Sequence, residues 1–390
     1  MTKPKVVSLF SGCGGLDLGL KEAGFHIIWA NDFAKDAVAT YKHNFGNHIV
    51  LGDITKIPSE QIPDDFDLLV GGFPCQGFSI ANTKRNMQDS RNFLYKELLR
   101  VLKDKNPKFF IAENVKGLLS MEKGKVMEMI VRDFESLGYT VDYQLLKASE
   151  YGVPQNRERV IILGNKLGLK NTFPTKTHID KAKQITVEQA IGHLADVKTR
   201  DLPFELDGEM VYNHIARTDV LDIFFARKHD VNQADLCDYL RAYRTSTKIS
   251  TPEIDKKLGY KHTAPHWFRR DRYGSIPKPK DWWDLKKILG FDDKYDQQVT
   301  ELEQRNITFD QSLRVSNWDS PSDTLTATGP EIHPNRERRL SVRECAILQS
   351  FPNDFVFQGS LSSMYTQVGN AVPPLLGKLL GLEILDKLKI

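Results

Sequence analysis

The stretch VVSLFSGCGGL (residues 6–16) decides the fold of this chain. Its apolar, β-branched half, VVSLF (6–10), predicts a buried strand, and the residues that follow predict a helix from about Leu16 to Ala23. A glycine-rich turn lies between the two. Glycines let the backbone pass close to a ligand at the carboxyl end of a strand, where open α/β sheets bind ligands. This stretch therefore predicts a strand–turn–helix unit that borders a ligand site.

The remainder of the first 165 residues alternates short apolar runs with helical patterns. Helices are predicted at 37–41, 94–104 and 126–138. Further strands are predicted in HIIWAN (26–31), HIVLGD (48–53), DLLVGG (67–72), KFFIAEN (108–114), TVDYQLLKA (140–148) and RVIILGN (159–165). Alternation of this kind, with nearly continuous apolar strands, indicates an α/β fold: a parallel or mostly parallel, doubly wound sheet covered on both faces.

The periodic pattern weakens after about Asn165. We expect residues 1–165 to form the first part of the main domain and residues 166–330, which show no sustained period, to form a second, smaller and irregular domain. Residues 331–390 return to the main domain. A helix is predicted within 340–351, where Ser341 and Glu344 have capping-box spacing, and the last helix is predicted at about Leu375–Lys389.

Composition limits the classes of protein to consider. The chain has 390 residues, of which 40% are hydrophobic and 27% charged, so it can bury a core. Its four cysteines are too few and too scattered for a disulfide scaffold, and they form no CxxC pair, which argues against a zinc knuckle. We expect no metal site and a reduced, cytoplasmic protein. No apolar stretch approaches the ~20 residues that cross a bilayer, so no membrane contact is expected.

Charge is unevenly distributed along the chain. Residues 241–287 contain 13 Lys+Arg and 5 Asp+Glu, whereas the remainder contains 41 and 46. A basic segment within a mildly acidic chain indicates a polyanionic partner, although a solvated lysine-rich helix would give the same count. The segment also holds Trp267, Trp282 and Trp283, and these favour a contact surface.

The glycine turn and the next strand ends suggest a nucleoside ligand. A dinucleotide fingerprint would need a glycine at position 17, where the chain has Asp17. Asp32, at the end of the second strand, could accept both hydroxyls of a ribose, and Asp53, after the third, could accept an adenine amino hydrogen. Phe10 and Phe33 could enclose the base. S-adenosylmethionine fits this set better than a dinucleotide, but both acids could equally be helix caps or turn residues.

A thiol and a carboxyl follow the next two strands. Cys75 stands behind Pro74 in GGFPCQGFS (71–79), in a glycine-flanked turn where a nucleophile would be well placed, although a lone cysteine is more often a packing residue. Glu113 follows FFIA and reaches the same edge, where it could act as a proton donor or simply cap the helix after it. No histidine at a strand end could serve Cys75 as a base, which argues against a thiol hydrolase.

These residues together resemble a known family, the DNA cytosine-5 methyltransferases of bacterial restriction–modification systems. The matching segments, in order, are LFSGCGG (9–15), GGFPCQGFS (71–79), ENVKG (113–117), YGVPQNRERV (151–160), RRLSVRECAILQSFP (338–352) and QVGNAVPP (367–374). The chain departs from the pattern at Ser8, where many relatives have an acidic residue, and at Ala371, where some have serine.

The resemblance implies an S-adenosylmethionine-dependent methyltransferase (Rossmann-like) fold and a catalytic role for five residues. Cys75 would be the nucleophile and Pro74 its positioner, while Glu113 would face the base's N3 and amino group and Arg159 its O2, with Arg157 nearby. The residues expected to line the cofactor are Phe10, Gly12, Gly14, Asp32, Phe33, Asp53, Asn370 and Ala371. The last helix would pack beside the first strand.

The resemblance also implies the partners. Duplex DNA would bind the loop from Ser79 through Ile80 to Arg91, and residues 166–330 would form the target-recognition domain. The residues expected to contact DNA are Gln76, Ser79, Arg269, Arg270 and Arg272. A monomer is expected, associated with the nucleoid, with a cognate restriction endonuclease acting on the same site. The alternatives are a transfer-RNA cytosine-5 methyltransferase, a catalytically inactive DNA-binding relative and a thiol oxidoreductase, which the missing CxxC disfavours.

Overall fold

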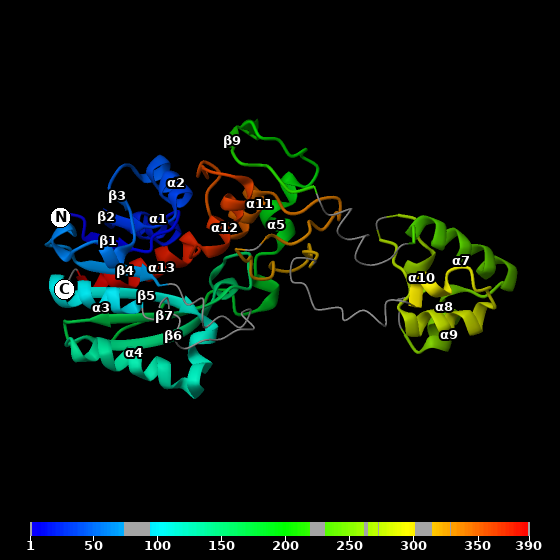
Figure 1. The fold of residues 1–390 in the computed structure, drawn as a ribbon, viewed down its shortest axis with the longest axis horizontal. Helices are drawn as coiled ribbons and strands as arrows, with labels where there is room; N and C mark the ends of the chain where they lie inside the picture. Colours follow the sequence, from blue (N-terminus) through cyan, green and yellow to red (C-terminus); the bar gives the residue numbers. More distant parts are fainter. Residues whose placement is uncertain are drawn as a thin grey trace. The chain divides into compact units, whose positions relative to one another are not determined.

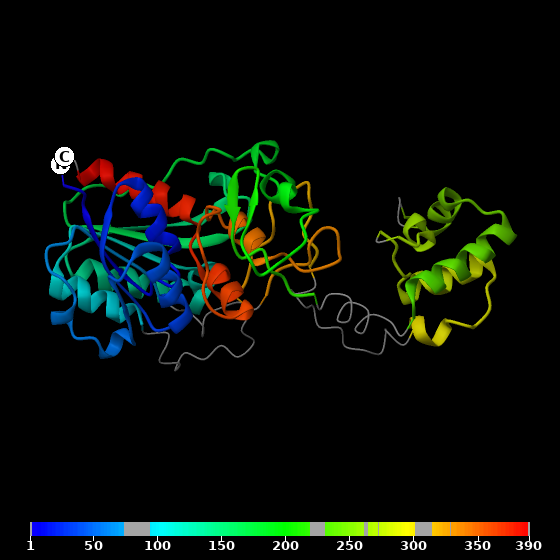
Figure 2. The same cartoon turned by 90° about the horizontal axis from the view of Figure 1, so that it is seen from above.

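The structure is a computed structural model that describes residues 2–73, 94–218, 231–260, 264–271, 273–300, 314–327 and 329–388. The chain forms two compact units (Figures 1 and 2). Unit 1 comprises Met1–Ala216, Ser316–Pro330 and Leu340–Ile390. Unit 2 comprises Arg217–Val315 and Glu331–Arg339. The compact second unit thus begins at residue 217 rather than at 166, and residues 166–216 belong to unit 1.

Unit 1 is built on a seven-stranded sheet of order β3-β2-β1-β4-β5-β7-β6. The bonded pairs among the first five strands are parallel, and β7 is antiparallel to both of its neighbours. The strands are β1 (Lys5–Leu9), β2 (His26–Asp32), β3 (Ile49–Leu51), β4 (Leu68–Gly72), β5 (Phe109–Val115), β6 (Thr140–Lys147) and β7 (Glu158–Asn165). The expected mostly parallel sheet is confirmed, and the reversed direction of β7 is the feature that the apolar runs did not reveal.

Helices cover both faces of this sheet (Figure 1). They are α1 (Gly15–Ala23), α2 (Lys35–Phe45), α3 (Tyr95–Lys105), α4 (Lys125–Ser136) and α13 (Pro374–Leu388). Successive residues of β1 point to opposite faces: Val7 packs with the apolar sides of α3 and α4, whereas Val6 packs with those of α1 and α13. Alternation along a strand buried on both faces explains why the strands read as unbroken apolar runs.

The last helix, α13, packs against the first helix, α1. α13 packs along α1, where Gly19 allows close approach: a Cβ on this residue would lie 2.1 Å from the carbonyl oxygen of Pro374. The run Leu361–Leu388, which includes α12 (Leu361–Asn370), is long and apolar enough to cross a membrane by length and composition. Length and composition alone do not make this run a membrane span, so the prediction that the chain has none is not contradicted. Just over half of its most apolar window is buried in the fold, and packing on α1 accounts for that composition.

The remaining elements of unit 1 support the edge of the sheet. They are α5 (Val187–Ile191), β8 (Phe204–Leu206), β9 (Glu209–Val211) and α11 (Val342–Leu348). The predicted capping box of α11 is confirmed, because the Ser341 side chain accepts from Glu344 N while Glu344 accepts from Ser341 N at 2.7 Å. Arg343, also on α11, is fully buried and donates to three backbone carbonyls, of Tyr212, Pro352 and Phe355.

Unit 2 is helical, which corrects the expectation of irregular structure in this part of the chain. Its helices are α7 (Gln233–Thr247), α8 (Thr251–Leu258), α9 (Pro279–Leu289) and α10 (Asp296–Thr300). The expected contact role for the tryptophans is also wrong for two of them. Trp267 and Trp282 are buried in the core of this unit, where Trp282 donates to Asp296 at 2.8 Å, and only Trp283 is exposed.

Candidate active site

The topology of unit 1 gathers polar side chains at one edge of the sheet. Parallel strands β1, β2, β4 and β5 all end there. Because β7 runs the other way, its first residues reach the same edge, and Arg159 pairs in register with Val115 at the end of β5. The start of one strand therefore supplies Arg159, the cation that the resemblance implies, while the end of its neighbour supplies the predicted acid, Glu113.

Glu113 and Arg159 form an ion pair at this edge. The Arg159 Nε lies 2.8 Å from Glu113 Oε1, and the side chains are only 13% and 11% exposed. Burial lowers the pKa of Arg159, and the carboxylate of Glu113 opposes that shift. The other carboxylate oxygen faces β4, since a Cβ on Gly72 would lie 2.9 Å from Glu113 Oε2. Glycine at position 72 therefore leaves room for the carboxylate, which the resemblance placed against the target base.

Asn114 fixes the segment that precedes the predicted nucleophile. Its Nδ2 donates to the carbonyl oxygen of Phe73 at 3.1 Å, and its Oδ1 accepts from Val115 N at 2.8 Å. The predicted Pro74, Cys75, Gln76 and Ser79, and the loop through Ile80 to Arg91, lie outside the described residues. Asn114 had no role in the sequence-based prediction, but its bond holds the backbone one residue before Pro74.

Arg157 supports the site without facing it. It is fully buried, and its two terminal nitrogens donate to the carbonyl oxygens of Leu325 at 3.1 Å and Gly369 at 2.8 Å. Burial lowers the pKa of its guanidinium well below the ordinary value. The structure therefore separates the two arginines of the QNRER segment, because Arg159 meets Glu113 whereas Arg157 joins distant parts of unit 1.

Two buried glutamines extend this support to a predicted cofactor residue. Gln155 donates to Gln349 Oε1 at 2.6 Å and accepts from Leu325 N at 3.2 Å. Gln349 in turn donates to the carbonyl oxygens of Val368 at 3.1 Å and Ala371 at 2.7 Å. Sequence reasoning missed both roles, although both glutamines lie within segments that carried the resemblance.

The glycine turn after β1 has an unusual backbone. Phe10 adopts a positive φ of 53°, which is rare for an aromatic residue and signals strain of the kind found at functional sites. Gly12 donates its N–H to Asp32 Oδ2 at 2.8 Å, and Gly14, with a φ of 93°, begins α1 as its N-cap. The turn is thereby tied to the end of β2, as expected for residues that share one pocket.

The two predicted cofactor acids also serve as backbone acceptors. Asp32 accepts from Gly12 N and, through Oδ1, from Ala34 N at 2.8 Å, and burial raises its pKa. Asp53 caps a short turn by accepting from the backbone N and hydroxyl of Thr55, which lowers its pKa. Asp53 is therefore a helix cap and Asp32 an acceptor within a turn, which are the two roles weighed as alternatives, and each carboxylate retains lone pairs for a ligand.

An exposed ring and residues 370–372 follow or adjoin the segments that carry the glycine turn. Phe33 is 70% exposed, an unusual state for a phenylalanine beside two buried strand ends. Ala371 reaches the glycine turn, since a Cβ on Gly15 would lie 3.1 Å from Ala371 Cβ and 2.4 Å from Val372 O. Asn370 is the last residue of α12. The first and last matching segments are therefore adjacent in space.

A buried acid lies behind this turn. Asp17 accepts from Ser8 Oγ at 2.7 Å and from Tyr41 OH at 2.8 Å, and the Tyr41 oxygen lies 3.2 Å from His48 Nε2. Burial raises the pKa of Asp17 to about 6, although the two hydroxyl donors oppose the shift. Ser8 is the position where many relatives have an acidic residue. In this chain the acid comes from α1 instead and bonds directly to that serine.

The predicted DNA-contacting arginines of unit 2 pair with local acids. Arg269 bonds Asp271 through two nitrogens, and Arg270 Nη2 lies 2.9 Å from Asp238 Oδ2. Arg272 lies outside the described residues. Both described arginines are exposed, at 43% and 60% of their side chains, and pairs of this kind contribute only about 0–1 kcal/mol to stability.

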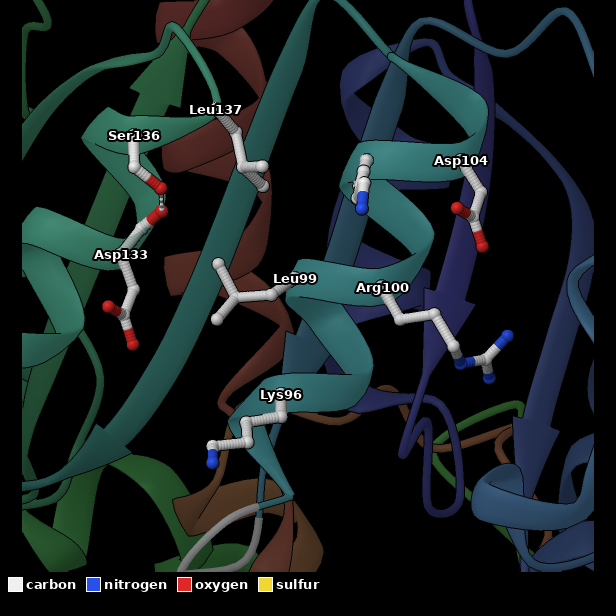
Figure 3. Close-up of a pocket in the computed structure, with 8 residues that line it drawn as sticks. Lys96, Leu99, Arg100, Asp104, Asp133, Ser136 and Leu137 are labelled. Carbon is white, nitrogen blue, oxygen red and sulfur yellow. Dashed lines mark hydrogen bonds between the residues drawn. The ribbon is translucent and has the colours of Figure 1, made fainter.

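A shallow groove between α3 and the end of α4 lies apart from these residues (Figure 3). Its lining includes Lys96, Leu99 and Arg100 of α3, and Asp133 and Leu137 on the α4 side. Arg100 is already bonded to Glu97 and to Ser59. None of the predicted site residues lines the groove.

In the described part of the chain, no cluster of three or more His, Cys, Asp or Glu residues could hold a metal ion.

Comparison with known proteins agrees with this geometry. The family model for C-5 cytosine-specific DNA methylase matches residues 4–386. The type II methyltransferase M.NgoFVII of Neisseria gonorrhoeae is 34% identical over 95% of this chain and 84% of its own length. M1.HphI of Haemophilus parahaemolyticus, also a type II methyltransferase, is 33% identical over 97% and 86%.

Solved structures show the same fold at lower identity. A prophage-encoded Escherichia coli protein described as a DNA modification methyltransferase covers both chains fully, with a TM-score of 0.63 at 22% identity. The Entamoeba histolytica methyltransferase EhMeth has full coverage, a TM-score of 0.57 and 16% identity. The fold is therefore that of the S-adenosylmethionine-dependent methyltransferases, as expected.

The chain belongs to the C-5 cytosine-specific DNA methylase family. It is a C-5 cytosine DNA methyltransferase of the type II restriction–modification class, with DNA as its substrate and S-adenosylmethionine as its methyl donor. The family and cofactor predictions are confirmed. The roles of individual residues and the details of the reaction go beyond this assignment.

Proposed function

We propose that the chain methylates carbon 5 of a cytosine flipped out of a specific duplex DNA sequence, through a transient bond between Cys75 Sγ and carbon 6 of the base. The observation that supports this most is the ion pair of Glu113 and Arg159 at the carboxyl edge of the sheet. The backbone of Phe73, which leads into Pro74 and Cys75, is bonded to Asn114 beside that pair. The acid Glu113, the guanidinium of Arg159 and the backbone of Phe73, two residues before Cys75, are thus linked through neighbouring residues of β5.

The thiolate of Cys75 adds to carbon 6 and breaks the 5,6 double bond of the ring. Electron density moves toward N3 and O2, so the developing negative charge needs a donor at each atom. In the proposal Glu113 shares a proton with N3, and the guanidinium of Arg159 lies against O2. These contacts are strongest in the transition state, which is where binding energy accelerates a reaction.

Carbon 5, now enamine-like, forms a bond to the methyl group. Bound S-adenosylmethionine would supply that methyl from an electrophilic sulfonium, whose carbon–sulfur bond breaks with the electron pair retained by sulfur as a neutral thioether. A base then removes the carbon-5 proton, and the electron pair of that C–H bond expels the Cys75 thiolate and restores the ring. The target must leave the base stack for this geometry, and base flipping costs a few kcal/mol.

The residues around the glycine turn fit a nucleoside ligand. Asp32 would accept the ribose hydroxyls and Asp53 an adenine amino hydrogen, while Phe10 and Phe33 would enclose the ring. The exposed ring of Phe33 and the strained backbone of Phe10 support this fit. Gly12, Gly14, Asn370 and Ala371 would line the same pocket.

Recognition of the target sequence is assigned in this proposal to the middle of the chain, including unit 2 and its basic segment. The enzyme would act as a cytoplasmic, nucleoid-associated monomer. It would protect sites that a cognate restriction endonuclease cleaves, with no direct contact between the two proteins implied. Methylation-aware sequencing of DNA from cells that express the chain would give the recognised sequence.

Cys75→Ser tests the proposal. We expect this variant to lose methyl transfer, because serine is a far weaker nucleophile, while it retains DNA and cofactor binding. Cys237→Ala is the matched control, since Cys237 is a buried cysteine of unit 2 and should keep activity. Wild-type rates in Cys75→Ser would remove the thiol from the mechanism.

The transfer-RNA alternative is tested in the same assay. Duplex DNA and transfer RNA are offered separately with labelled cofactor, and we expect label to enter the DNA alone. Label in transfer RNA without label in DNA would favour the alternative. Binding of DNA without transfer to either substrate would indicate an inactive relative.

A further inference from the structure

Residues 266–271 and 273–274 of unit 2 form a turn that holds Arg269 at a defined position. Trp267 and Phe268, directly before it, are buried in the core of the unit. The turn is closed by backbone bonds from Ser275 N to His266 O at 3.0 Å and from Gly274 N to Asp271 O at 2.8 Å. The backbone of Arg269 is thus fixed on both sides.

The Arg269 side chain is held as firmly as its backbone. Its Nε donates to Asp271 Oδ1 at 3.0 Å and its Nη2 to Asp271 Oδ2 at 2.5 Å. Asp271 is itself oriented, because Tyr273 N donates to its Oδ1 at 3.1 Å. The guanidinium lies over the Tyr273 ring, 5.0 Å from the centroid, and the side chain remains 43% exposed.

This arrangement leaves the outer end of the guanidinium available. Arginine has five N–H donors, and the pair with Asp271 uses the Nε hydrogen and one Nη2 hydrogen. The second Nη2 hydrogen and the two on Nη1 have no hydrogen-bond acceptor within the described residues. They form the planar fork that matches O6 and N7 of guanine in the major groove.

We propose that Arg269, oriented by Asp271 and Tyr273, reads a guanine in the target sequence. This inference rests on the proposed function of unit 2 in recognition. The fixed orientation of Arg269 supports a base rather than a phosphate as the partner. Asp271 and Tyr273 hold the plane of the guanidinium, and reading a base edge requires directed donors, whereas a phosphate contact positions DNA without reading its sequence.

Arg270 provides the contrast within the same segment. Its Nη2 lies 2.9 Å from Asp238 Oδ2 in an ion pair, and its side chain is 60% exposed. A loosely held guanidinium of this kind suits a phosphate contact, which positions DNA without reading its sequence. In this proposal Arg269 reads a base and Arg270 contacts a phosphate, because their acid partners hold the two guanidinium groups differently.

The experiment uses the full-length enzyme and a duplex that contains its recognised site. Each guanine is replaced in turn by 7-deazaguanine, which lacks the N7 acceptor. At one position we expect wild-type binding to weaken, by less than the about 5–150-fold that losing a whole bidentate contact costs, because O6 remains as an acceptor. Arg269→Ala removes both bonds, so it should lose about 5–150-fold on the natural site and show no further loss with 7-deazaguanine at that position. Arg269→Lys should not restore discrimination.

Arg270→Ala is the matched control. It should weaken binding to all duplexes alike and reduce the salt dependence of binding by about one counterion. The inference is overturned if Arg269→Ala also weakens binding to all duplexes alike. It is likewise overturned if the loss of binding in Arg269→Ala adds to the loss caused by 7-deazaguanine at every position. Methylation of the unmodified duplex by wild-type enzyme is measured alongside. Absence of that activity would refute the proposed function, whereas its presence without coupling at Arg269 refutes only this inference.

Discussion

Polar groups are held differently at the carboxyl edge of the sheet in unit 1 and in the turn around Arg269 in unit 2. Glu113, Gln155 and Gln349 are buried, and the Arg159 side chain is only 13% exposed. Each is bonded to a partner from a distant part of the chain. Arg269 is exposed and bonded to a residue two positions away. Residues that carry out a reaction shared by a family need positions fixed by several contacts. Residues that read a DNA sequence, which differs between family members, need to be replaceable without disturbing the fold.

The largest effect is expected where the buried edge performs chemistry. Glu113→Gln should reduce kcat by about 10²–10⁴-fold, because an amide cannot share a proton with N3, while KM for the cofactor stays nearly constant. Steady-state methylation assays measure both constants. Glu158→Gln is the control: Glu158 lies beside Arg159 in sequence but pairs with Lys116 at the surface. A Glu113→Gln enzyme with wild-type kcat would refute the role of this carboxyl.

A smaller effect is expected where the buried edge only supports chemistry. Gln349→Leu removes the acceptor of Gln155 and the donor to Ala371 O, so several buried polar groups lose partners. We expect the free energy of unfolding to fall by roughly 2–4 kcal/mol and KM for the cofactor to rise more than kcat falls.

Urea unfolding and steady-state kinetics measure these changes in Gln349→Leu. The exposed Gln61→Leu, which makes the same substitution on the surface, should change neither quantity appreciably. A loss below about 0.5 kcal/mol in Gln349→Leu, the range of ordinary surface changes, would show that the glutamine network is not a support.

The smallest of the three effects depends on pH. The pKa of Asp17 is raised from 3.8 to about 6 in the folded chain, so the folded state keeps a proton that the unfolded state releases between these values. Asp17 therefore lowers the free energy of unfolding as pH rises from about 4 to 6, by up to about 3 kcal/mol. Asp17→Asn should remove this dependence and gain stability relative to wild type over the same range.

Urea unfolding at intervals between pH 4 and 8 measures the difference between Asp17→Asn and wild type. Asp64→Asn, at an exposed carboxylate, controls for the removal of a charge. A difference between Asp17→Asn and wild type that does not change with pH would contradict the account of this buried acid.

Much of unit 1 could be predicted from its sequence because strands buried on both faces leave continuous apolar runs. The reversed direction of β7 could not, since the run RVIILGN reads alike in either direction. Unit 2 was harder because its helices bury large aromatic residues. Trp267 and Trp282 resembled contact residues in sequence, although they form the core.

The site shows the same division. Glu113 and Arg159 lie in segments specific enough to identify them, and the structure brings them together. Asn114, Gln155 and Gln349 act through bonds to backbone groups far away in sequence, and no local pattern reveals such partners. Arg157 and Arg159 are the same residue type in the same motif. Only the burial of Arg157 indicates that it supports the fold rather than contacting the target base.

The central claim is that the sulfur of Cys75 bonds to the target base, and one measurement tests it directly. The enzyme is incubated with S-adenosylmethionine and a duplex that contains 5-fluorocytosine at the target position, where fluorine blocks the final proton removal. The account predicts a stable protein–DNA adduct, carrying the transferred methyl group, that mass spectrometry maps to Cys75. No adduct on a site proven to be methylated, or an adduct at another residue, would contradict it.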